Sequence, residues 1–260
     1  MGYNFSKRTK HFTLPKQWAS MRVAKQLEKE TGKKIIHCEK GDYQGPDFET
    51  PQHILDATVH ALEAGYVRYD PGPGLPELRE YIATETMKDR RPGTTPDEVI
   101  ITAGAKNALT MSLLTILEDG DEVVFPNPGY PPDEVWAKYA NAKIQHTPLN
   151  KGDWQYDIAK LDKMITDKTK LLIINTPQRP NGQLVENPEE IAEIVLKHPD
   201  LLVITDEIFS QVIYDGQKHK TISSIPEMKD RCIVIDTSVS YTHLRAHETR
   251  HDLVCRLLLE

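Results

Sequence analysis

The sequence is poor in cysteine and has no surplus of positive charge. Its 260 residues include three cysteines, and its formal net charge is -7 at pH 7. Cys38, Cys232 and Cys255 are widely spaced and form no CxxC pair, which indicates reduced thiols in a cytoplasmic protein rather than a disulfide framework. An acidic chain also lacks the basic surface that binding to nucleic acid or to an anionic membrane requires. These absences favour a small-molecule ligand.

Long apolar runs are missing as well. No stretch approaches the roughly 18 to 20 apolar residues of a membrane span, and the first residues lack the apolar core of a signal peptide. Hydrophobic residues still make up 38% of the chain and charged residues 27%, a composition typical of a globular protein with a sizeable core. We therefore expect a cytoplasmic globular protein with no membrane and no nucleic-acid partner.

From residue 98 onward, short apolar runs alternate with amphipathic segments. Residues with helical spacing, such as Leu109, Leu113 and Leu117, separate the runs, whereas residues 1–95 are expected to be helical or looped. This alternation predicts an α/β fold: a mostly parallel sheet with helices on both faces. Ligands of such sheets bind at the carboxyl ends of the strands. The predicted strands are residues 99–102, 122–125, 143–149, 170–176, 201–205 and 232–238.

Two turns follow the first two predicted strands. The small residues around Gly104 lead directly into a helix, whose free backbone N–H groups and dipole favour a phosphate, although many glycine turns before helices bind nothing. The loop at residues 126–131 holds Tyr130 among three prolines and a glycine. Tyr130 is either a ligand-facing ring or a tyrosine packed inside its loop.

The fifth predicted strand ends in two acids, Asp206 and Glu207. An apolar strand with acids at its tip is also found where nucleoside triphosphatases hold magnesium, but those proteins need a GxxxxGK[ST] loop. Here Gly32-Lys33 is followed by Lys34 and has no glycine five residues before it. The sequence therefore argues against a nucleoside triphosphatase.

Several motifs occur together in a fixed order along the chain. They are GPDFETP at 45–51, the turn at 69–74, LREYIA at 78–83, TAGAKNAL at 102–109, GDEVVFPNPGYP at 120–131, TPQRPNG at 176–182, DEIFSQVIYDG at 206–216 and DTSVS at 236–240. In combination they resemble the class I/II aminotransferases of fold type I, which use pyridoxal 5'-phosphate. The resemblance covers residues 33–240. It implies an N-terminal segment of a small domain at residues 1–49, an incomplete cofactor-binding large domain at 50–240, and a tail at 241–260 outside the family pattern.

The resemblance assigns a role to each matching position. Asp206 would pair with the protonated pyridine nitrogen of the cofactor, which keeps the ring positive as an electron sink. Tyr130 would stack on the ring face. The turn at Gly104 and the backbone N–H groups of Ala105 and Lys106 are expected at the phosphate. The hydroxyl of Ser238 would add a further donor to it.

Other expected contacts involve the substrate and a second subunit. Tyr69 would reach the phosphate of the neighbouring subunit, so the resemblance implies a homodimer in the intact parent protein. Gly41 or Gly45 would lie beside the substrate carboxylate. Both glycines remain candidates, because GDYQGPDF carries two more residues than the family pattern.

Two departures from the family surround the cofactor's phenolic oxygen. The family commonly has the asparagine of an NPTG motif and the tyrosine of DEIY there, and this chain has Arg179 and Phe209. A guanidinium can supply charged hydrogen bonds to a phenolate, whereas a phenylalanine ring cannot donate. We interpret Arg179 as a replacement donor, with a solvent-facing loop arginine as the alternative.

A third departure concerns catalysis. The family places its Schiff-base lysine directly after a Ser-x-Ser element, but Ser238-Val239-Ser240 is followed here by Tyr241, and no lysine follows. The last twenty residues resemble translated adapter or vector sequence joined to a truncated reading frame. Within them His243, His247 and His251 recur every four residues, yet no further ligand can be identified, so we expect no metal site.

The resemblance predicts an enzyme that moves an amino group between an amino acid and a 2-oxo acid through pyridoxal phosphate. The missing lysine predicts that the chain as given is inactive. Two alternatives stay open: a non-catalytic module that binds the cofactor or dimerises, and another fold type I enzyme such as a C–S lyase or a decarboxylase. The sequence does not identify the amino acid substrate.

Overall fold

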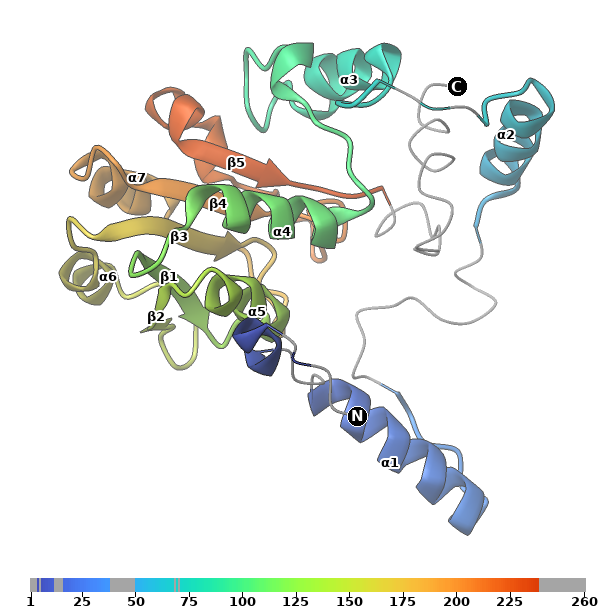
Figure 1. The fold of residues 1–260 in the computed structure, drawn as a ribbon, viewed down its shortest axis with the longest axis horizontal. Helices are drawn as coiled ribbons and strands as arrows, with labels where there is room; N and C mark the ends of the chain where they lie inside the picture. Colours follow the sequence, from blue (N-terminus) through green and yellow to red (C-terminus); the bar gives the residue numbers. More distant parts are fainter. Residues whose placement is uncertain are drawn as a thin grey trace.

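A computed structural model describes residues 4, 6–11, 16–37, 50–67, 69 and 71–238 of the chain. Its centre is a five-stranded sheet with the order β2-β1-β3-β4-β5, in which every neighbouring pair is parallel (Figure 1). The predicted α/β fold with a parallel sheet is confirmed. The strands are β1 (Glu122–Asn127), β2 (Lys143–Pro148), β3 (Thr169–Asn175), β4 (Leu202–Asp206) and β5 (Cys232–Ile235).

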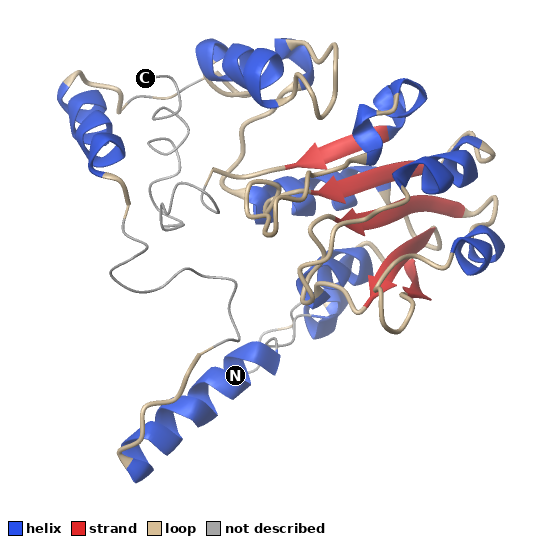
Figure 2. Ribbon diagram, turned by 180° about the vertical axis from the view of Figure 1, so that it is seen from behind, coloured by secondary structure: helices blue, strands red, loops and turns tan. Residues whose placement is uncertain are grey.

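Helices cover both faces of the sheet, as Figure 2 shows from behind. The helices between successive strands are α5 (Pro131–Tyr139), α6 (Ile158–Met164) and α7 (Pro188–Leu196), and α4 (Ala105–Ile116) directly precedes β1. One core cluster joins the sheet to α6 and α7, and a second joins it to α4 and α5. The connections between parallel strands therefore place a hydrophobic layer on each side of the sheet.

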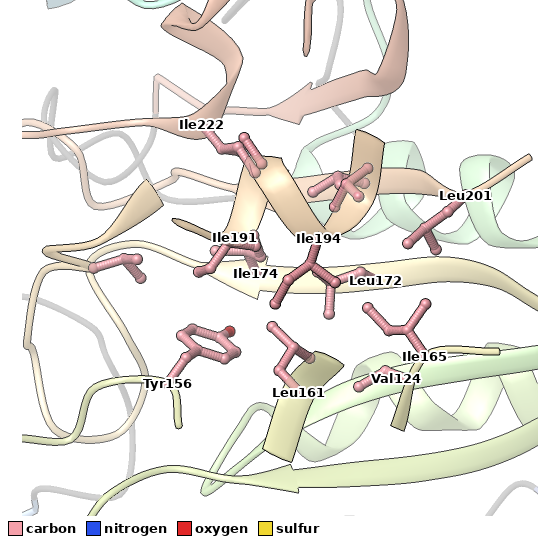
Figure 3. Packing of buried hydrophobic residues seen from close by; sticks show 14 of the residues in the cluster. Val124, Tyr156, Leu161, Ile165, Leu172, Ile174, Ile191, Ile194, Leu201 and Ile222 are labelled. Carbon is pink, nitrogen blue, oxygen red and sulfur yellow. The ribbon is translucent and has the colours of Figure 1, made fainter. Parts of the chain in front are cut away.

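The central strand β3 shows why the sheet is buried on both faces. Leu172 and Ile174 pack into the cluster with α6 and α7 (Figure 3), and Leu171 and Ile173 pack into the cluster with α4 and α5. All four side chains are at most 2% exposed. Because successive strand residues point to opposite faces, a continuous apolar run supplies both layers, at about 1.5 to 3 kcal/mol for each fully buried side chain.

The predicted strand at residues 99–102 is wrong. These residues lie in no strand, and Ile100 is 68% exposed. The N–H of Ile101 donates to the carbonyl of Pro73 at 2.8 Å, which is a loop contact rather than a sheet ladder. The apolar, β-branched run has strand propensity, but among the described residues no strand lies beside it to share hydrogen bonds.

The segments before the sheet are helical, as expected. Figure 1 shows α2 lying apart from the sheet and α3 beyond its β5 edge. Within the described part of the chain, no helix is long and apolar enough to cross a membrane. The remaining elements are η1 (Lys7–His11), α1 (Lys16–Thr31), α2 (Gln52–Glu63), α3 (Pro76–Tyr81), η3 (Ile82–Thr86), η4 (Pro96–Glu98), η5 (Ile222–Ser224) and η6 (Pro226–Arg231).

Candidate active site

The predicted site residues that the structure describes lie, with one exception, at one edge of the sheet. All five strands are parallel, so the loops that follow them emerge on the same side, and the start of α4 lies there too (Figure 1). This is the edge at which α/β sheets bind ligands. The residues in these loops and turns are Gly104, Ala105, Lys106, Tyr130, Arg179, Asp206, Phe209 and Ser238.

Asp206 is the last residue of β4, and its carboxylate is buried, with 5% exposure. The side-chain amide of Asn175 on β3 donates to Oδ2 at 3.3 Å, and the backbone N–H of Ile208 donates to Oδ1 at 3.2 Å. Burial raises the pKa of Asp206 above its ordinary value, and the positive charge of Arg179 opposes that rise. The position suits a buried carboxylate that pairs with a cation.

Arg179 supplies that cation in this structure. Its Nη2 atom forms an ion pair with Oδ2 of Asp206. The guanidinium carbon lies 3.8 Å from the centre of the Tyr130 ring and 5.7 Å from that of Phe209. The side chain is 20% exposed. The alternative of a solvent-facing loop arginine is therefore wrong, while a role as a donor to a phenolic oxygen stays a prediction.

Gly104 caps the start of α4 with φ +76° and ψ 165°. This φ lies in the left-handed region, which glycine adopts without strain. The first N–H groups of the helix that bond to Gly104 are those of Asn107 and Ala108. Among the hydrogen bonds of the described residues, none uses the N–H groups of Ala105 or Lys106, which leaves two donors at a positive helix end.

The structure does not bring every predicted residue together. Tyr69 is fully exposed and belongs to none of the loops that follow the strands. Ser238 is half-buried and follows the end of β5 at the expected edge. Gly41, Gly45 and Tyr241 lie outside the described residues, as do His243, His247 and His251.

A buried ion-pair network next to Asp206 was not anticipated from the sequence. Glu207 is fully buried, and its Oε2 atom accepts a hydrogen bond from Nε of Arg90 at 2.8 Å. Nη1 of the same guanidinium donates to Oδ2 of Asp236 at 2.6 Å. The hydroxyls of Thr205 and Thr221 also donate to Glu207. The network joins the loop after η3 to the ends of β4 and β5, so it fixes the backbone that carries Asp206.

The charges in this network shift the pKa values of its members. Burial lowers the pKa of Arg90, but attraction to Asp236 and Glu207 outweighs it, so the guanidinium stays protonated. Burial also lowers the pKa of His219, whose Nδ1 is 3.9 Å from Glu207 and whose Nε2 is 3.0 Å from the carbonyl oxygen of Thr176. Cys232 is a free thiol whose pKa burial raises to about 12.

These features define an α/β protein whose sheet edge combines a buried carboxylate, an aromatic face and a helix N-terminus. The family model for aminotransferase class I and II matches residues 33–241. The chain therefore belongs to the class I and II aminotransferase family, whose fold is that of the fold type I enzymes that depend on pyridoxal phosphate.

Individual relatives agree with this assignment. The aspartate aminotransferase of Pyrococcus abyssi is 38% identical over 195 residues, and the probable aspartate aminotransferase of Methanocaldococcus jannaschii is 36% identical over 193; each match covers 74% of this chain and 50% of the relative. The solved alanine aminotransferase of Pyrococcus furiosus aligns with a TM-score of 0.79 and 32% identity, over 90% of this chain and 59% of that one. The chain spans about half the length of these curated relatives.

The residues at the sheet edge fit pyridoxal phosphate. A buried carboxylate at Asp206 suits a protonated ring nitrogen, and the face of Tyr130 suits a flat ring, because both already hold a flat cation in this structure. The two N–H groups at the start of α4 suit a phosphate. Arg179 lies between the carboxylate of Asp206 and the ring of Tyr130.

Proposed function

We propose that this chain forms the cofactor-binding part of a pyridoxal-phosphate-dependent aminotransferase, which moves an amino group between an amino acid and a 2-oxo acid. The observation that supports this most directly is the arrangement of Tyr130 and the buried Asp206 beside the start of α4 at one sheet edge. The names of the relatives make aspartate and alanine the first amino donors to test. The proposed compartment is the cytoplasm, in keeping with a free thiol at Cys232.

Each residue has a separate task in this proposal. When bound, pyridoxal phosphate supplies an electron sink for the bond that is broken at the substrate carbon. Asp206 holds the ring nitrogen protonated, Tyr130 covers one ring face, and Phe209 excludes water nearby. The N–H groups of Ala105 and Lys106, together with the hydroxyl of Ser238, bind the phosphate.

The second candidate is a module that binds the cofactor without catalysis. The observation that favours it is Tyr241, which stands where the family has its lysine. A C–S lyase or decarboxylase would share the same cofactor contacts, and only the products separate it from an aminotransferase. Product analysis with a panel of amino acids distinguishes all three functions.

Replacing Asp206 by asparagine is expected to weaken cofactor binding by roughly 10- to 100-fold, because a charged hydrogen bond to the ring nitrogen contributes about 1.5 to 3 kcal/mol. Pyridoxamine 5'-phosphate is a suitable probe, since it has no aldehyde to react with surface lysines. Its binding can be followed by its fluorescence. Asp162→Asn is the matched control, because Asp162 forms an exposed ion pair with Lys197 on the surface. Equal affinity of the two variants would contradict the assigned role of Asp206.

We also propose that the intact protein is a homodimer in which Tyr69 contacts the partner's cofactor phosphate. Tyr69 is fully exposed, and α2 buries none of its residues. Leu55, Val59 and Leu62 form an exposed apolar stripe on one face of that helix, at 40% to 54% exposure. Contiguous exposed apolar surface is a feature of protein–protein interaction sites.

The chain is therefore expected to sediment as a species larger than its monomer mass of 29.6 kDa. Leu55→Glu with Val59→Glu should shift it toward the monomer, since two charges would be buried in the contact. His53→Glu with His60→Glu adds the same charges on the opposite side of α2 and should leave sedimentation unchanged. A monomeric wild-type chain would argue against association through α2.

A further inference from the structure

The guanidinium of Arg179 lies between the Tyr130 ring and the Asp206 carboxylate. We call the position between these two groups the ring slot. It stacks on Tyr130 at 3.8 Å and forms an ion pair with Asp206. The centre of the Phe209 ring lies 5.7 Å from the guanidinium carbon. These contacts hold a flat, positively charged group in a fixed orientation.

A guanidinium and a protonated pyridine ring would bind in the ring slot through the same kinds of contact. Both are flat, both carry a positive charge, and both donate an N–H to a carboxylate oxygen. Oδ2 of Asp206 already accepts from Arg179 and from the amide of Asn175. The face of Tyr130 and this carboxylate therefore cannot serve Arg179 and a cofactor ring at the same time.

The surrounding charges make Asp206 dependent on Arg179. Three carboxylates meet at the ends of β4 and β5, namely Asp206, Glu207 and Asp236, and Arg90 is engaged with the last two. Arg179 is the cation left for Asp206 within the described part of the chain. Because burial raises the pKa of Asp206, its anionic form needs a positive partner in the ring slot.

We propose that Arg179 is a placeholder for the cofactor ring: its guanidinium fills the ring slot until the protonated ring displaces it, and Arg179 thereby sets the affinity and rate of cofactor capture. The proposal rests on the proposed function, because it takes the ring slot as the cofactor's site. Chains with Arg179 in the slot are not competent to bind, so the observed affinity falls by the competent fraction.

The test compares the wild-type chain with Arg179→Asn, using pyridoxamine 5'-phosphate as the probe. If the ring slot is open in about a tenth of wild-type chains, the variant is expected to bind the probe about tenfold more tightly. The variant should also associate with the probe faster. Lys197→Asn removes the same charge from an exposed surface pair and should leave the affinity unchanged. Stopped-flow fluorescence gives both the rate and the affinity.

Chemical rescue provides a second readout that a merely structural role would not move. Methylguanidinium added to the Arg179→Asn chain should refill the ring slot and weaken probe binding toward the wild-type value. Sodium chloride at the same ionic strength should not. In the wild-type chain, where the slot is already filled, methylguanidinium should have a smaller effect.

The outcomes separate this inference from the proposed function. If the wild-type chain binds the probe and Arg179→Asn binds it equally or more weakly, the placeholder role is overturned while the cofactor site stands. Weaker binding would instead assign Arg179 a contact with the bound ring, such as its phenolic oxygen. If neither chain binds the probe, the proposed function fails and the inference fails with it.

Discussion

Replacing Arg90 by methionine is expected to lower the free energy of unfolding by about 3 to 5 kcal/mol, because it leaves the buried carboxylate of Glu207 without its cation. Glu207 is fully buried, and the Arg90 side chain is 10% exposed. Nε and Nη2 of Arg90 both contact Oε2 of Glu207, at 2.8 and 2.7 Å, and Nη1 contacts Asp236. Against a typical stability of roughly 5 to 15 kcal/mol, this loss is large.

The measurement is urea unfolding followed by circular dichroism, with Lys197→Met as the control. Lys197 pairs with Asp162 at the surface, where both side chains are about half exposed, so its loss should change stability by about 0 to 1 kcal/mol. Adding Glu207→Gln to Arg90→Met should recover part of the lost stability, because the unpaired buried charge is removed. A loss below about 1 kcal/mol for Arg90→Met would show that water reaches Glu207.

The same network explains why part of the site escaped prediction. Arg90 and Glu207 are 117 positions apart in the sequence, and nothing local to either residue identifies the other as its partner. The sequence shows two acids at the end of an apolar strand and therefore a need for a cation. Which cation meets which acid depends on how the loop after η3 packs against β4 and β5.

Features that depend on local chemistry were predicted well. The apolar runs from residue 122 onward form the parallel strands β1 to β5. A short continuous apolar run is typical of a strand that is buried on both faces of a parallel sheet. Gly104 occupies a left-handed backbone position before a helix, as its place in the motif indicates. Asp206 ends a strand at the ligand edge, where the resemblance expected it.

Features that depend on distant partners were predicted poorly. Residues 99–102 have strand propensity, but a strand also needs a neighbour, and the run is a loop here. The ion pair between Arg179 and Asp206 was not anticipated either. The family pattern has an asparagine at this position, so it carries no information about where a longer, charged side chain goes.

The largest functional effect is expected at Tyr241. The family's lysine binds the cofactor covalently through its amine, and a tyrosine side chain has no amine with which to form that bond. We therefore expect 2-oxo acid formation from aspartate or alanine to stay at the rate of free pyridoxal phosphate. Loss of a catalytic nucleophile lowers kcat by on the order of a millionfold in other enzymes.

Trapping with borohydride tests the same point without turnover. After the chain is mixed with pyridoxal phosphate and reduced, peptide mapping should find no label at residue 241 and weak, scattered label on surface lysines. Tyr241→Lys should gain label at that position if the ring slot places the cofactor beside it. Tyr241→Lys alone is not expected to restore turnover, because residues 242–260 lie outside the family match, which covers residues 33–241. Appreciable turnover by either chain would show that residues after Ser240 contribute a working active site, and that the family pattern is a poor guide to this part of the sequence.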